Sequence, residues 1–297
     1  MIRLDLPSPI QIIRFEGRSF FLKRDDLIHP DFSGNKARKL YYFLQHDLPH
    51  IRSVVSYGSI QSNAMYSLSV LAKHRGWRFE YHVDNIPDYL KENPHGNYQE
   101  ALKNGMQLIV GADPVSAQRF GDDILFIEEG GRQQEAAYGI EILAQEIVDW
   151  QKAYEIDALN IFLPSGTGTT ALFLQKYLVK GQPQGATPTV YTCPCVGDDV
   201  YLKKQFEMLE EDVLFHPRII SLGKKHHFGK LYRENYEIWL KLQQQTGVTF
   251  DLLYDPLGWR TLLEHPEVME RPILYLHQGG LLGNESMLPR YERKYKM

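Results

Sequence analysis

The sequence predicts an α/β protein built around parallel β-sheet, because apolar strand patterns and helix patterns alternate along it. The run "SVVSY" (53–57) is typical of a buried strand, and the helical pattern "NAMYSLSVLAKHRG" follows it and ends at a glycine. The strands "FEYHV" (79–83) and "MQLIV" (106–110) then flank the helical "NYQEALKN". A strand that is followed by a helix and another strand pairs in parallel, so this order favours a parallel sheet with helices on its faces.

A second α/β unit is predicted to begin near Gln145. A long amphipathic helix from about Glu135 to Tyr154 precedes the strand "NIFLP", the loop "SGTGTT", the helix "ALFLQKYLV" and the strand "TVYTC". The last third contains the helical "YRENYEIWLKLQQQTG", the turn-rich "LLYDPLGW" and the short strand "PILYLH". We expect two α/β lobes with a ligand site in the crevice at the carboxyl ends of the strands.

Composition points to a small-molecule partner. The chain has 297 residues, of which 43% are hydrophobic and 24% charged, and its formal net charge is -4. This charge gives no electrostatic reason to expect binding to nucleic acid or to an acidic membrane. The N-terminus lacks a signal-peptide profile and no apolar run approaches the roughly 20 residues of a membrane span, so a cytoplasmic location is expected. The two cysteines, Cys193 and Cys195, indicate buried thiols rather than a disulfide framework or a zinc site.

The stretch "FSGNKARKL" (32–40) places a lysine at a helix start. A helix that opens at Asn35 disfavours a cation in its first turn, so Lys36 stands where a neutral amine is easier to hold. Counting about 100° per residue, we expect Lys36 to flank the apolar stripe and Arg38 and Lys39 to face solvent. Two interpretations remain open. Lys36 is either a surface lysine whose stem lies on apolar atoms, or an amine with a lowered pKa that serves as nucleophile or base.

The loop "SGTGTTA" (165–171) between a strand and a helix resembles a phosphate cradle, since free N–H groups and a helix dipole attract anions. Its glycines fit the dinucleotide pattern G-x-G-x-x-G/A, but no acidic residue stands about 20 positions on, and no lysine follows as in a Walker A loop. Its hydroxyls favour a single phosphate monoester. A dinucleotide and an ordinary tight turn stay as alternatives. The residues predicted to bind phosphate are Gly166, Thr167, Gly168, Thr169 and Thr170.

The stretch "GSIQSNA" (58–64) also lies at a strand-to-helix junction. Gln61, Ser62 and Asn63 place two amides and a hydroxyl beside free N–H groups, which suits a carboxylate and a ring oxygen. The alternative is a plain helix cap, because serine and asparagine are preferred there.

The turn "LLYDPLGW" (252–259) carries Tyr254 beside Asp255. The carboxylate could pair with a protonated ring nitrogen and the phenol could stack or transfer protons, whereas Asp-Pro is also a common turn starter. An amine nucleophile, a cradle for a phosphate monoester, a ring-oxygen contact and a carboxylate for a ring nitrogen together suit pyridoxal 5'-phosphate.

The ordered set "KRDDL", "GNKARKL", "GSIQSNA", "SGTGTT", "LLYDP" and "HQGG" resembles the 1-aminocyclopropane-1-carboxylate deaminase and D-cysteine desulfhydrase family of pyridoxal phosphate enzymes, from about Lys23 to Gly280. The resemblance implies the tryptophan-synthase-β-like fold, with two three-layer parallel-sheet domains and the active site in the crevice between them. It implies a homodimer. It also implies a larger cofactor domain formed by residues 1–44 and 145–297, and a smaller domain, 45–144, inserted between these two parts.

Position by position, Lys36 matches the lysine that forms a Schiff base with the cofactor and later moves protons. Asn63 matches the contact to the phenolic oxygen of the cofactor, and Ser62 with Gln61 matches the site of the substrate carboxylate. Residues 167–170 match the phosphate loop. Tyr254 matches a tyrosine beside the reacting carbons.

Other positions depart from the family. Asp255 stands where the deaminases have the glutamate that faces the pyridine nitrogen, and Gln278, which we expect near the substrate, stands where they have an apolar residue. Ala64 replaces the usual histidine or glutamine. The chain thus follows neither the deaminase nor the desulfhydrase pattern.

We therefore predict a pyridoxal phosphate-dependent deaminase, a lyase or hydrolase by class, that converts a small amino acid, such as 1-aminocyclopropane-1-carboxylate or one like D-cysteine, to a 2-oxo acid and ammonia. The alternatives are a cofactor-binding protein with little turnover and a nicotinamide-dependent oxidoreductase that uses the Gly166 loop. No metal site is expected. His226 and His227 are adjacent, and on a strand they would point to opposite faces.

Overall fold

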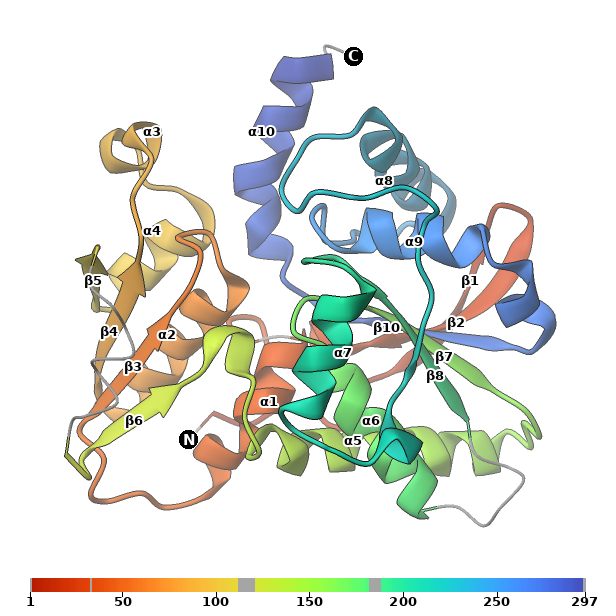
Figure 1. Cartoon of the computed structure of the whole chain (residues 1–297), viewed down its shortest axis with the longest axis horizontal. Helices are drawn as coiled ribbons and strands as arrows, with labels where there is room; N and C mark the ends of the chain where they lie inside the picture. Colours follow the sequence, from red (N-terminus) through yellow and green to blue (C-terminus); the bar gives the residue numbers. More distant parts are fainter. Residues whose placement is uncertain (1, 33, 112–120, 182–187, 296–297) are drawn as a thin grey trace.

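The computed structural model describes residues 2–32, 34–111, 121–181 and 188–295, and within these ranges the chain forms two β-sheets (Figure 1). The larger sheet has the order β1-β2-β10-β7-β8-β9 and the smaller one the order β5-β4-β3-β6. The strands of the larger sheet are β1 (Ile10–Phe15), β2 (Arg18–Arg24), β7 (Asn160–Ser165), β8 (Thr189–Pro194), β9 (Arg218–Ile219) and β10 (Ile273–His277). Those of the smaller sheet are β3 (Ser53–Tyr57), β4 (Arg78–Val83), β5 (Met106–Val110) and β6 (Ile124–Ile127).

The larger sheet combines both ends of the chain. Strands β1 and β2 form an antiparallel hairpin, and β10 from the C-terminal part lies parallel to both β2 and β7. The helices α5 (Ala136–Ala153) and α6 (Thr169–Gly181) share one apolar core with β7 and β10. On the opposite face, α8 (Arg233–Thr246) and α9 (Asp255–Leu263) share another core with β1 and β2. This sheet therefore lies between two helical layers, as Figure 1 shows.

The smaller sheet is parallel throughout, as the alternation of strands and helices predicts. It packs with α2 (Asn63–Arg75), α4 (Gly96–Lys103) and α1 (Gly34–Gln45) around one core. Helix α2 ends at Gly76, which adopts a left-handed conformation with φ of 70° and closes the last turn. The remaining helices are α3 (Asp88–Glu92), α7 (Asp199–Glu207) and α10 (Asn284–Tyr295), and the short 3₁₀ turns include Asp25–Leu27 and Glu129–Gly131.

Two details of the predicted elements are wrong. Helix α1 begins at Gly34 rather than after a cap at Asn35, and Ser33 lies outside the described residues. The stretch "LLYDPLGW" is a turn only in its first half, because α9 starts at Asp255 with Pro256 in its first turn, where a missing N–H costs no hydrogen bond. The predicted domain boundaries stay a prediction, and the one at 144/145 falls inside α5.

The predicted exposure of Arg38 and Lys39 is also wrong, since their side chains are 0% and 3% exposed. Helix α1 packs against α5 while its other side contributes to the core of the smaller sheet, so it has no broad solvent face. Arg38 donates to Asp25 Oδ1 at 2.8 Å and to Glu146 Oε1 at 2.7 Å. Lys23 completes this buried ion-pair network through Glu146 Oε2 at 2.6 Å.

In the part of the chain that the structure describes, no helix combines the length and the apolar character that crossing a membrane requires.

Candidate active site

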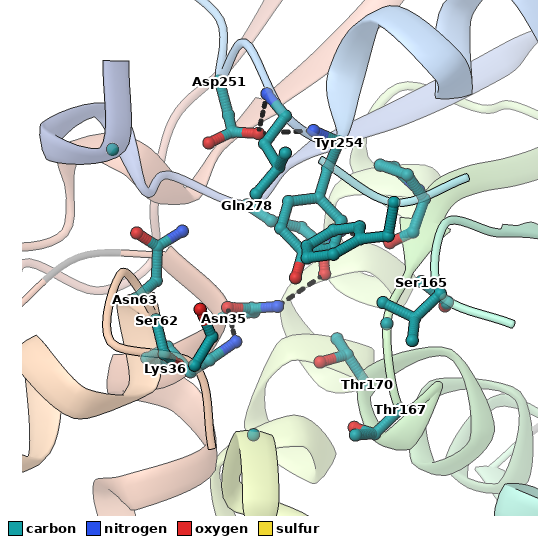
Figure 2. A pocket seen from close by; sticks show the side chains of 18 of the residues that line it. Asn35, Lys36, Ser62, Asn63, Ser165, Thr167, Thr170, Asp251, Tyr254 and Gln278 are labelled. Atoms are coloured by element: carbon teal, nitrogen blue, oxygen red, sulfur yellow. Dashed lines mark hydrogen bonds between the residues drawn. The ribbon is translucent and has the colours of Figure 1, made fainter. Parts of the chain in front are cut away.

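The cavity that collects the predicted residues has a volume of about 430 Å³ and is lined by α1, by the segments that follow β3 and β7, and by residues 251–255 and 278–290 (Figure 2). Every side chain or glycine predicted to bind cofactor or substrate lines it. These residues are Lys36, Gln61, Ser62, Asn63, Gly166, Thr167, Gly168, Thr169, Thr170, Tyr254, Asp255 and Gln278. The cavity lies where parallel strands of both sheets end, which is the usual ligand position in such sheets.

Lys36 extends from the first turn of α1 into this cavity. Its Nζ donates to Asn35 Oδ1 at 3.1 Å, and no carboxylate oxygen of the described residues lies within 4.0 Å of it. Burial lowers the pKa of Lys36 to about 8, and the charge of Asp251 opposes this shift. A substantial fraction of the amine is therefore neutral near physiological pH, as a nucleophile or base requires.

A turn at the end of β10 holds the start of α1. The amide N–H of Asn35 donates to the Gln278 carbonyl at 3.1 Å, and Gly34, with φ of 65°, approaches so closely that a Cβ there would overlap that carbonyl. The Gln278 side chain donates to Pro164 O at 2.6 Å and accepts from Asn35 Nδ2 at 2.9 Å. Gln278 thus links the lysine helix to the end of β7.

The same turn brings the opposite wall close. A Cβ on Gly280 would overlap Asn63 Nδ2 and would lie 3.5 Å from Asp251 Oδ2. The absence of a side chain at Gly280 therefore leaves room for the amide of Asn63 beside this turn.

The loop after β7 presents hydroxyl groups at the start of α6. Thr167 Oγ1 and Thr169 Oγ1 are 3.0 Å apart. Thr170 Oγ1 is buried and has no hydrogen-bond partner among the described protein atoms. Gly168 has φ of 69°, and a Cβ there would overlap the Phe206 ring. Unpaired hydroxyl and N–H groups at a helix start are suited to an anion.

Ser62 and Asn63 begin α2. Ser62 Oγ accepts from the Ala64 N–H at 3.1 Å, so the predicted cap interaction is present. Asn97 Nδ2 donates to Asn63 Oδ1 at 2.7 Å and to Gln61 O at 3.0 Å, which directs Asn63 Nδ2 toward Gly280. Gln61 Nε2 donates to Tyr89 OH at 2.9 Å.

Tyr254 lies above Lys36 in Figure 2, together with Asp251, which the sequence analysis missed, and Asp255 lines the same cavity. Asp255 Oδ1 accepts from Tyr275 OH at 2.7 Å and its Oδ2 accepts from the Asp251 N–H at 3.0 Å. Burial and the nearby Asp251 raise the pKa of Asp255 well above its usual range. Burial raises the pKa of Asp251 to about 6, so Asp251 is the carboxyl group of this pair that ionises first.

Lys39 is a second amine that the sequence analysis missed. Its Nζ donates to Gly130 O at 3.0 Å, and no carboxylate oxygen of the described residues lies within 4.0 Å. Burial, and then the charge of Lys36, lower the pKa of Lys39 well below its ordinary value. Gly130 in turn lies against Thr167, so Lys39 borders the predicted phosphate loop. The sequence contains a signal for Lys39, because Lys36 and Lys39 are three residues apart and such residues are neighbours on the surface of a helix.

Comparison with known proteins finds relatives that match most of the chain. No family model matches the chain. The chain is 25% identical over 289 residues to the D-cysteine desulfhydrase of Serratia proteamaculans, with 89% of this chain and 87% of that protein covered. It is 24% identical over 314 residues to the mitochondrial bifunctional D-cysteine desulfhydrase/1-aminocyclopropane-1-carboxylate deaminase of Arabidopsis thaliana, with 94% and 77% covered.

Solved structures agree on the fold. A crystal structure of an ACC deaminase homologue superposes with a TM-score of 0.80 at 21% identity and covers 98% of this chain and 95% of its own. A pyridoxal 5'-phosphate-dependent aspartate racemase superposes with a TM-score of 0.59 at 13% identity and covers 92% and 90%. The predicted fold class and the predicted resemblance to the deaminase and desulfhydrase family are confirmed.

Proposed function

We propose that this chain is a pyridoxal 5'-phosphate-dependent deaminase or lyase that converts a small amino acid to a 2-oxo acid and ammonia. The names of its relatives support this function over a nicotinamide-dependent oxidoreductase and over a binding protein without turnover. They give no support to a hydrolase class. The single observation that carries the proposal is the meeting of Lys36, the threonine loop and Asn63 in one cavity.

The residues present fit the phosphate of the cofactor. Thr170 Oγ1 is a buried hydroxyl that still needs a partner, and Thr167 and Thr169 add two more hydroxyls at the start of α6. Lys39 adds a buried amine without a carboxylate beside this loop. A phosphate monoester bound here would satisfy the hydroxyls and would raise the pKa of Lys39 back toward its ordinary value.

Bound pyridoxal phosphate supplies an aldehyde that Lys36 can attack and a ring that accepts electrons from the substrate. We propose that Lys36 Nζ holds the cofactor, is freed by the substrate amine, and then takes and returns protons at the substrate carbons. Its pKa of about 8 keeps part of the amine neutral for these roles.

The other residues orient the reactants. We propose that Asn63 Nδ2, directed by Asn97, donates to the phenolic oxygen of the cofactor, and that the start of α2 with Gln61 and Ser62 binds the substrate carboxylate. Tyr254 stands beside the reacting carbons.

We propose that the remaining cavity residues contact the ring nitrogen of the cofactor and the substrate. The pair Asp251 and Asp255 supplies one negative charge near the ring nitrogen, because burial and the nearby Asp251 raise the pKa of Asp255 well above its usual range, whereas the pKa of Asp251 is raised by burial only to about 6. We propose that Gln278 also lies near the substrate. Its side-chain amide accepts a hydrogen bond from Asn35 Nδ2 and donates one to Pro164 O, so it orients Asn35.

The first test is the visible absorbance of purified protein mixed with pyridoxal phosphate. We expect a bound, coloured cofactor in the wild type and in the control variant Lys73→Ala, whose lysine is exposed on α2. The colour should be lost in Lys36→Ala, because the covalent attachment point is removed. Wild-type protein that takes up no cofactor would sink the proposal.

The second test is a panel of D- and L-cysteine, D- and L-serine and 1-aminocyclopropane-1-carboxylate, assayed for ammonia and 2-oxo acid. Coloured protein that releases neither product from any amino acid would favour the binding-protein alternative. We also propose a homodimer in the cytoplasm, for which the mass in solution and fractionation of the source cells are the direct measurements.

A further inference from the structure

The outer end of the cavity is formed by a basic segment that the proposed mechanism does not use. Residues 221–233, "SLGKKHHFGKLYR", contain four lysine or arginine residues and no aspartate or glutamate, in a chain whose formal net charge is -4. Phe228 and Gly229 of this segment line the cavity together with Met287 and Arg290 from α10. In Figure 1 the helix α10 lies at the top of the view, between α4 and α8.

Arg290 has unused hydrogen-bonding capacity. Its Nη2 donates to Gly229 O at 3.3 Å and its Nη1 contacts Met287 Sδ at 3.1 Å. Within the described ranges, no carboxylate oxygen lies within 4.0 Å of its guanidinium group. A guanidinium group has five N–H donors in a planar fork, so most of this fork is left for another acceptor.

The guanidinium group is connected through Gly229 and Phe228 to Tyr254, which we propose to stand beside the reacting carbons. The ring of Phe228 lies 5.3 Å, centroid to centroid, from the ring of Tyr254, and Gly229, the contact of Arg290, directly follows Phe228. The phosphate loop has its own cation in Lys39, which comes from α1 and not from α10. Arg290 is therefore available to the substrate rather than to the cofactor phosphate.

The other cations of the segment do not find carboxylate partners either. Lys230 lies over the Tyr232 ring at 5.4 Å and Arg233 over the Tyr295 ring at 5.1 Å, and the ion pairs of the described residues include neither. Burial lowers the pKa of His226 to about 4, so that ring is neutral near pH 7. The basic character of the segment thus comes from its lysine and arginine side chains, and the ion pairs of the described residues include none of them.

We propose that the amino acid substrate carries a second carboxylate, beyond its α-carboxylate, and that Arg290 binds it. This inference rests on the proposed function and names its substrate class as acidic amino acids that carry a leaving group on the β-carbon. A carboxylate can accept two parallel hydrogen bonds from the planar guanidinium group of Arg290, whereas a small apolar side chain offers it no acceptor. The basic segment also attracts substrates with a net negative charge and raises their association rate.

The test uses substrate pairs that differ in charge and share a hydroxyl leaving group on the β-carbon: the stereoisomers of 3-hydroxyaspartate against those of 3-hydroxyasparagine. Loss of the hydroxyl group as water and hydrolysis of the resulting enamine give a 2-oxo acid and ammonia without an oxidant. With cofactor-loaded wild type we expect kcat/KM for the better acid to exceed that for its amide by about 10- to 100-fold, as loss of charge-assisted hydrogen bonds predicts. Arg290→Gln should remove this preference by raising KM for the acid, and Arg290→Lys should restore part of it.

The matched control is Arg293→Gln, an exposed arginine one turn further along α10 that does not line the cavity. It should keep the wild-type preference. Equal kcat/KM for acid and amide in the wild type, or an unchanged preference in Arg290→Gln, would overturn the proposal. A large loss of cofactor affinity in Arg290→Gln would also overturn it, because the guanidinium group would then serve the cofactor phosphate.

A binding experiment separates this inference from the proposed function. Calorimetric titration of the loaded protein with succinate and with its monoamide, succinamate, needs no turnover. We expect succinate to bind about 10-fold more tightly or better, and Arg290→Gln to abolish the difference. If no amino acid reacts, the proposed function fails, and equal affinity for the two probes would still refute the carboxylate site.

Discussion

Helix α1 contributes residues to two clusters of ionisable side chains, and the two clusters differ in whether their members form ion pairs with one another. The buried ion-pair network of Lys23, Asp25, Arg38 and Glu146 pairs each charged group with at least one opposite charge. The pocket cluster of Lys36, Lys39, Asp251 and Asp255 contains no ion pair within 4.0 Å. Every charge of the network is thus compensated by another protein side chain, whereas we expect the charges of the pocket cluster to be compensated by a bound ligand.

The difference separates structural residues from functional ones along one helix. Arg38 and Lys39 are neighbours in sequence and equally buried, but only Arg38 is neutralised. Burying an unpaired charge costs free energy unless a partner arrives. Of the two sets compared, only the one around the cavity retains that cost.

The largest expected effect comes from breaking the ion-pair network. Asp25→Ala removes the acceptor of two Arg38 hydrogen bonds and leaves a buried guanidinium group under-compensated. We expect the free energy of unfolding to fall by about 3–5 kcal/mol. Urea unfolding of the protein without cofactor measures it, and Asp251→Ala, a buried carboxylate outside the network, should cost much less. Equal losses in the two variants would contradict the comparison.

The next effect contrasts two buried lysines. Lys39→Met should leave the free energy of unfolding unchanged or higher, since no ion pair is lost, while cofactor affinity falls about 10- to 100-fold for a lost contact to phosphate. Lys23→Met should lower the free energy of unfolding and leave cofactor affinity intact, because Lys23 pairs with Glu146 and lies outside the cavity. Unfolding curves and cofactor titrations of both variants measure these two effects. Loss of stability in Lys39→Met together with loss of cofactor affinity in Lys23→Met would count against the proposed phosphate site.

A smaller effect is the pH dependence due to Asp251. The pKa of this carboxyl group rises from 3.8 to about 6 on burial, so the folded state holds its proton more tightly than the unfolded state. The resulting stabilisation is fully present below pH 3.8 and is lost as the pH rises through about 6. Asp251→Asn should flatten the profile between these values by about 1–3 kcal/mol. Unfolding free energies at pH 4 to 7 test this, and parallel profiles would refute it.

The smallest effect compares two buried threonines. Thr192 Oγ1 donates to Leu163 O at 2.8 Å and contacts Ser165 Oγ at 2.6 Å, whereas Thr170 Oγ1 has no partner among the described protein atoms. Thr192→Val should lower the free energy of unfolding by about 1 kcal/mol, and Thr170→Val should not. Only Thr170→Val should weaken cofactor binding. A stability loss in Thr170→Val would mean that its hydroxyl is already satisfied in the free protein.

Much of this arrangement could be predicted from the sequence because it follows from local signals. The alternation of strands and helices predicts the parallel sheets, and glycine-rich turns after apolar strands predict the loops that line the cavity. Gly76 ends α2 as its sequence position indicates.

The errors arise where burial depends on distant segments. The amphipathic pattern of α1 predicts that Arg38 is exposed to solvent. In the structure α5, about 100 residues further along the chain, covers Arg38 and contributes Glu146, which accepts a hydrogen bond from it. Lys39 could have been found, since it lies only about 60° around the helix from Lys36. Asp251 and Arg290 carry no local motif, and only the folded chain brings them to the cavity.

The close approach at Gly280 has a consequence for how this cavity can change. Because a single methyl group there would overlap the side-chain amide of Asn63, any residue larger than glycine at this position would displace the amide that we propose to contact the cofactor. Substitutions that broaden the range of accepted molecules are therefore expected at side chains that line the cavity, such as Phe228 and Arg290, rather than at Gly280.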